Sequence, residues 1–130
     1  MKKIVALCAV SAAILAGCGS FNAKTVPSNI KVDNVCVLQR ANSPLIAQYI
    51  SENLTQRGIS NHIVKTQGTC KNIIWYNARM NGDYQYITKS TTSIKINDKR
   101  VGTVKYKNRD KVTSLKDQVN NIMTNLLGRR

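Results

Sequence analysis

Four cysteines and a single histidine are the residues of this 130-residue chain best suited to chemistry. Cys8 and Cys18 lie near the start, which leaves Cys36 and Cys70 as an even pair in the body of the chain. An even pair predicts a disulfide if the chain reaches an oxidising compartment. The alternatives are a metal site that uses both thiols and His62, or a redox-active pair. Neither has the support of a Cys-x-x-Cys motif or paired-histidine spacing, so we expect a disulfide, no metal and no cofactor.

Residues for catalysis are scarce in this sequence. His62 is the only histidine, and six acidic residues are spread along the chain. We find no Ser-His-Asp set, no paired carboxylates and no glycine-rich phosphate loop. His62 is most simply a strand or surface histidine. We therefore expect a protein that is not an enzyme.

The charge of the chain is strongly positive. It has 20 Lys and Arg against six Asp and Glu, a formal net charge of +14. Such a surface favours anionic partners such as lipid headgroups, lipopolysaccharide phosphates or acidic proteins. The alternative is a solvated face that serves only solubility, because no long basic run concentrates the charge.

Alternation in the strand candidates indicates where a binding surface would lie. Ile74, Tyr76 and Ala78 share one parity, while Trp75 and Arg79 have the other. If the apolar parity faces the core, one open face carries an aromatic residue surrounded by cations, a surface suited to an anionic, partly apolar ligand. The residues that we expect on this face are Trp75, Arg79, Lys95, Lys105 and Lys107.

Two helices and a set of strands must position these residues. Ser43, Pro44 and Gly58 delimit the first amphipathic helix, and Ser114 and Gly128 delimit the second. The strand candidates are 35–38, 59–65, 71–80, 84–96 and 100–107. The order β-α-β-β-β-(β)-α predicts an α+β two-layer sandwich, a mainly antiparallel sheet of four or five strands with both helices on one face.

Two turns and one irregularity are expected between these strands. Asn81-Gly82 is the strongest signal for a two-residue hairpin, and Asn97-Asp98-Lys99 predicts a second turn. The apolar parity of 84–96 switches along its length, which predicts a bulge or break near 89–91.

The first twenty residues have the layout of an export signal. Lys2 and Lys3 precede an apolar run of about fourteen residues, which is too short to cross a bilayer. The run ends in Leu-Ala-Gly-Cys18, which resembles the lipobox of bacterial lipoproteins. That resemblance implies cleavage of a signal peptide at 1–17, lipidation of Cys18, a tether over 18–34 and a single domain over 35–130. Gly19 and Ser20 follow Cys18 in place of aspartate, which by the same resemblance implies the outer membrane, on its periplasmic side.

The spacing of several residues in the body resembles a small uncharacterised family of proteobacterial lipoproteins. The matching features are Val35-Cys36, Cys70, Tyr76-x-Ala78, Asp83, Tyr86, Val101-Gly102 and Tyr106. The resemblance implies a location and a fold but no activity.

We therefore expect a non-enzymatic interaction protein of the envelope, anchored to the membrane by its N-terminal lipid. The alternatives are a binding or assembly factor for lipopolysaccharide or another anionic envelope polymer, and an enzyme inhibitor. Nucleic acid is not expected as a partner, because an exported protein rarely meets it.

Overall fold

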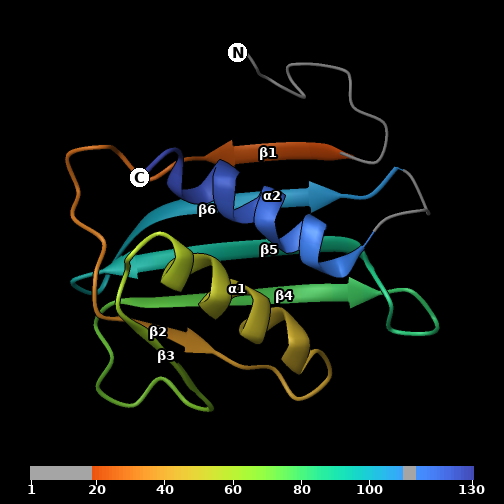
Figure 1. Ribbon diagram of the computed structural model, residues 1–130, viewed down its shortest axis with the longest axis horizontal. Helices are drawn as coiled ribbons and strands as arrows, with labels where there is room; N and C mark the ends of the chain where they lie inside the picture. Colours follow the sequence, from red (N-terminus) through yellow and green to blue (C-terminus); the bar gives the residue numbers. More distant parts are fainter. Residues whose placement is uncertain (1–18, 110–113) are drawn as a thin grey trace.

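Six strands and two helices make up the fold in the computed structural model, which describes residues 19–109 and 114–130. Both helices lie on the same face of a single sheet (Figure 1). The elements are β1 (Ser20–Lys24), β2 (Val35–Leu38), α1 (Pro44–Gln56), β3 (Asn61–Val64), β4 (Ile73–Met80), β5 (Ile87–Ile96), β6 (Lys99–Lys107) and α2 (Leu115–Leu127). The expected α+β class, with both helices on one face, is confirmed.

The sheet is mixed and has six strands in the order β1-β6-β5-β4-β2-β3. Neighbouring strands pair antiparallel from β1 through β6 and β5 to β4. Strand β2 lies parallel to both of its neighbours, β4 and β3. The expectation of four or five mainly antiparallel strands therefore contained at least one strand too few. It also did not include the two parallel pairings of β2 at one edge of the sheet. The parallel pairing of β2 with β3 follows from α1, which carries the chain back across the sheet between them.

Local signals delimit both helices at the residues that the sequence predicts. Pro44 begins α1, and Gly58 follows it with a φ of +76°. The Ile59 N–H donates to the Leu54 carbonyl, as expected when a left-handed glycine closes a helix. The Ser114 hydroxyl caps α2 by accepting from the Asp117 N–H at 3.1 Å. The Ser43 side chain makes no such bond, so Pro44 is the stronger start signal for α1.

The core lies between the helices and the sheet. Tyr76, Ile94 and Val104 from the central strands pack against Ile50 of α1 and Met123 of α2, and all five are almost fully buried. Burial of this kind stabilises by roughly 1.5–3 kcal/mol for each large apolar side chain. The apolar residues that alternate along β4 and β6, as the sequence predicts, therefore form the face of the sheet on which both helices pack.

The segment expected to be a tether is part of the fold. Ser20–Lys24 forms the edge strand β1 beside β6, and Val26 and Val32 are buried. The Arg130 guanidinium then donates to the Val26 and Pro27 carbonyls, both at 2.7 Å. Residues 20–34 therefore pack together with the rest of the described fold. The sequence did not indicate this strand because β1 is short and polar, and its order comes from pairing with distant β6.

The turns differ in detail from their sequence signals. Asn97 and Asp98 both have positive φ and join β5 to β6, so this turn is confirmed. The Asn81-Gly82 pair does not make a two-residue hairpin. Instead the Asn81 side chain accepts from the Gln85 and Tyr86 N–H groups and organises a longer loop. The irregularity in β5 leaves Thr88 out of the register with β4, just before the expected position at 89–91, although its hydroxyl donates to the Arg79 carbonyl.

The signal peptide expected at 1–17 and the lipidation expected at Cys18 lie outside the described residues. Within 19–109 and 114–130, neither helix has the length and hydropathy needed to cross a membrane.

Candidate functional site

The strand register places the five residues of the expected binding surface on one face of the sheet. Trp75 lies opposite Ser93, and Arg79 lies opposite Lys89. The face opposite the helices, which we call the open face, carries the five side chains of Trp75, Arg79, Lys95, Lys105 and Lys107. In the part of the chain that is described, no helix covers this face (Figure 1).

A row of cations crosses the open face at one end. Arg79 of β4 pairs with Lys89 of β5, and Lys89 pairs with Lys107 of β6. The row ends at Ser20, the first residue of β1. We call Arg79, Lys89 and Lys107 the cation row. Lys89 was missed by sequence reasoning because the bulge at Thr88 obscures the parity of β5, although its even spacing from Lys95, six residues along the same strand, was a signal.

Acidic residues are absent from the strands that build the open face. None of the six described strands contains Asp or Glu. The two ion pairs among the described residues, Lys31–Asp33 and Lys116–Glu52, lie in a loop and between the helices. Like charges directly opposite each other on a sheet are destabilising. No acidic side chain on these strands therefore offsets the repulsion within the cation row.

A shallow cleft of about 490 Å³ adjoins the cation row. Its lining combines cations with hydrogen-bonding side chains and contains no acid: Arg40, Asn42, Asn77, Ala78, Arg79, Lys89, Ser90 and Thr91. A second hollow of about 390 Å³ shares Asn42 and Arg79 with it and extends toward Tyr84. The cleft offers positive charge and polar donors together, the combination that recognises phosphate.

Arg40 is held in place beside this cleft. Its guanidinium donates to the Tyr76 carbonyl at 3.0 Å and to Asn77 Oδ1 at 2.6 Å. The Tyr76 hydroxyl accepts from the Arg40 N–H at 3.0 Å and donates to the Ser43 carbonyl at 2.8 Å. Burial raises the pKa of Tyr76 above its ordinary value of 10.0, although the hydrogen bond from the Arg40 N–H and the charge of Arg40 act in the opposite direction. Tyr76 thus fixes the loop that supplies one wall of the cleft.

Trp75 is less exposed than a free tryptophan on an open face. It is half-buried, and Lys95 Nζ lies 5.5 Å from the centre of its ring. The negative face of an indole ring attracts a cation, and the aliphatic stem of the lysine covers part of the ring. Trp75 is therefore a partly covered aromatic, whereas Arg79, Lys105 and Lys107 on the same face are exposed.

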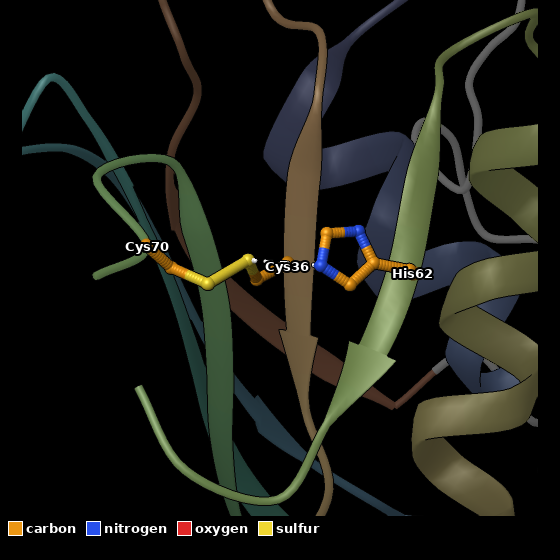
Figure 2. Close-up of side chains that lie close together, drawn as sticks. All are labelled: Cys36, His62 and Cys70. Carbon is orange, nitrogen blue, oxygen red and sulfur yellow. Dashed lines mark hydrogen bonds between the residues drawn. A yellow bond between two sulfur atoms is a disulfide. The ribbon is translucent and has the colours of Figure 1, made fainter. Parts of the chain in front are cut away.

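The two cysteines of the body form a disulfide, and His62 lies beside it. The Cys36–Cys70 bond closes a sequence separation of 34 residues, a loop that stabilises by about 3–4 kcal/mol in the chain-entropy model. Cys36 Sγ lies 3.7 Å from His62 Nε2 (Figure 2). His62 is an exposed strand residue, as expected, but its contact with Cys36 was not predicted. The parallel register of β2 and β3, which places the two opposite each other, brings them together.

The chain matches no model of a known protein family, no curated protein and no solved structure. The functional argument therefore starts from the open face and the Cys36–Cys70–His62 cluster.

Proposed function

We propose that this protein is a lipid-anchored envelope lipoprotein without enzymatic activity. Its place is the periplasmic side of the outer membrane, and its open face binds phosphate groups of an anionic envelope component such as lipopolysaccharide. The observation that carries the proposal is the cation row, in which Arg79, Lys89 and Lys107 lie directly opposite one another with no acid on their strands.

The energetics of the cation row favour a ligand over a role in solubility alone. Solubility requires charge that is spread over the surface, which the loops and helices can supply. Cross-strand pairs of like charge instead destabilise the sheet. A multivalent phosphate ligand would offset that cost by bridging neighbouring cations. The adjoining cleft adds Arg40 and the amides of Asn42 and Asn77 as further donors.

The start of β1 connects this face to the proposed anchor. Ser20 pairs with Lys107 at the end of the cation row. Cys18 precedes Ser20 by two residues, and such a segment spans at most about 7 Å. A lipid on Cys18 would therefore hold the cation row close to the phosphate-bearing membrane surface. Juxtamembrane Lys and Arg contribute about 1 kcal/mol each toward an anionic bilayer.

Vesicle binding tests the proposal. The chain from Gly19 to Arg130, which contains every described element, is sedimented with zwitterionic vesicles that contain or lack lipopolysaccharide. We expect binding only with lipopolysaccharide, and weaker binding at high salt. Replacing both Lys89 and Lys107 by glutamate should weaken binding about tenfold or more.

A matched control separates the cation row from net charge. Lys99 and Arg129 are exposed, and the register places Lys99 off the open face, opposite Ile96. Their double replacement by glutamate changes the net charge by the same amount and should leave binding within about twofold. Equal losses in the two double variants would show that the proposed surface is wrong.

The anchor has a separate test. Replacing Cys18 by alanine in the full chain should abolish incorporation of labelled fatty acid and release the protein from outer-membrane fractions. A Cys18→Ala variant that is still labelled would contradict the lipoprotein assignment while leaving the binding test unaffected.

A further inference from the structure

The Cys36–Cys70–His62 cluster contains three metal-binding side chains from separate segments. Cys36 comes from β2, His62 from the neighbouring parallel strand β3, and Cys70 from the loop before β4 (Figure 2). Their ligand atoms all lie within 4.8 Å of one another. Cys36 is buried, Cys70 half-buried and His62 exposed. The cluster thus has a buried base and one ligand at the surface, through which an ion can enter.

One edge of the cluster already has the length that a tetrahedral zinc site requires. With Zn–S bonds of about 2.3 Å and Zn–N bonds of about 2.1 Å, the sulfur–nitrogen edge of a tetrahedron is about 3.6 Å. Cys36 Sγ and His62 Nε2 are already 3.7 Å apart. A sulfur–sulfur edge would be about 3.8 Å, whereas a covalent disulfide bond joins the two sulfur atoms here. The disulfide must therefore open before these ligands can close around an ion, and Cys70 Sγ must also move, because the three ligand atoms are spread over up to 4.8 Å.

We propose that reduction of the Cys36–Cys70 disulfide converts this cluster into a Zn²⁺ site formed by Cys36, Cys70 and His62. The reductant is a dithiol, such as the active-site pair of a thiol–disulfide oxidoreductase. Two electrons and two protons pass from the dithiol to the disulfide, which becomes two thiols while the dithiol becomes a disulfide. Zn²⁺ then binds both thiolates and the neutral imidazole, with release of the two thiol protons.

The donor set selects the kind of ion. Two thiolates and one imidazole are the ligands of zinc and other thiophilic ions, whereas Mg²⁺ and Ca²⁺ prefer oxygen ligands. Three protein ligands leave the fourth position for water or another small ligand. Oxidation of the two thiolates to the disulfide would release the ion, so the site is linked to the redox state.

Cobalt(II) is the probe for this site, because thiolate coordination gives charge-transfer bands and a tetrahedral site gives intense visible bands. The protein is the full chain carrying Cys8→Ser and Cys18→Ser, so that Cys36 and Cys70 are its only thiols. We expect both sets of bands at one equivalent of Co²⁺ in the reduced protein, their loss on adding Zn²⁺, and no bands in the oxidised protein.

The His62→Ala variant tests the third ligand. It keeps both cysteines and should bind Co²⁺ on the order of tenfold more weakly or worse, since even outer-sphere partners of metal ligands contribute 10–100-fold. His62→Gln is a second variant with a side chain closer in size. Unchanged affinity in both variants would overturn the proposal.

A second measurement tests the proposal even if reduction unfolds the protein. Zn²⁺ should raise the thermal midpoint of the reduced protein, or refold it if reduction unfolds it, because the ion binds only the assembled site. A reduced protein that shows neither thiolate bands nor a zinc-dependent rise in thermal midpoint overturns the proposal.

Discussion

Gln118 is a polar residue in the middle of the core, and its hydrogen bonds explain why it is tolerated there. Its side chain is almost completely buried in α2. Its amide accepts from the Ile87 N–H at 2.7 Å and donates to the Ile87 carbonyl and the Tyr106 hydroxyl, both at 2.8 Å. Ile87 is where the pairing of β5 with β4 becomes irregular, so Gln118 supplies the partner that a backbone ladder would otherwise provide.

We therefore predict that Gln118→Leu destabilises the protein by about 3 kcal/mol, since it leaves buried backbone groups without partners. Urea denaturation measures the change. Gln48→Leu, an exposed substitution on α1, serves as the control and should change the free energy of unfolding by less than about 0.5 kcal/mol. Equal stability of the two variants would mean that the Gln118 bonds do not support the fold.

Tyr76 links stability to high pH. Because its folded-state pKa is raised, the folded protein holds the phenol proton more tightly than the unfolded chain does. This contribution is fully present below about pH 10 and is lost as the pH rises through the folded-state pKa. Tyr76→Phe should cost about 1–2 kcal/mol at neutral pH, because the Arg40 N–H and the Ser43 carbonyl lose their partner.

The stability difference between the native protein and Tyr76→Phe should therefore shrink as the pH is raised above 10. Urea denaturation at neutral pH and at high pH gives the two differences, and all other titrating groups are common to both proteins. A difference that stays constant or grows with pH would contradict the role assigned to this buried phenol.

At the scale of elements, β1 and the segment that follows it are integral to the sheet and its packing. It covers the edge of β6, and the following segment is held by the bond from the Val26 N–H to the Leu126 carbonyl at 2.8 Å. Gly102 of β6 lies so close to this segment that a Cβ at position 102 would be 2.8 Å from the Val26 side chain. The N-terminal segment therefore packs closely on β6 and α2.

Removal of residues 19–34 tests this boundary. A chain over 35–130 should be less stable than one over 19–130 by about 3 kcal/mol or more, because the buried side chains of Val26 and Val32 are lost along with β1. Thermal and urea unfolding measure the difference. Equal stability would restore the interpretation of this segment as a tether.

The sequence predicted those elements whose signals are local. Pro44, Gly58, Ser114 and Gly128 lie next to the helices that they delimit, so both helices could be located. The alternation along β4 and β6 likewise predicted the open face. The parallel pairing of β2 depends on contacts far apart in sequence, and so does the order of β1. For that reason neither the parallel edge nor the contact of Cys36 with His62 could be predicted.

At the scale of the whole molecule, charge and packing are divided between two faces. The helices cover one face of the sheet (Figure 1), and the acidic residues of the described chain lie on helices, loops and turns. The other face carries the cation row, the adjoining cleft and, beside β3, the Cys36–Cys70–His62 cluster. Substitutions on the open face should therefore alter binding far more than stability.

The central claim is that the open face binds phosphate groups, and the most direct measurement is a titration of the isotopically labelled chain over 19–130 with lipopolysaccharide, followed by amide chemical shifts. The account predicts that the largest changes fall on Arg79, Lys89 and Lys107 and on the neighbouring cleft residues Arg40 and Asn77. Changes concentrated on α1 and α2, or no changes at all, would contradict it.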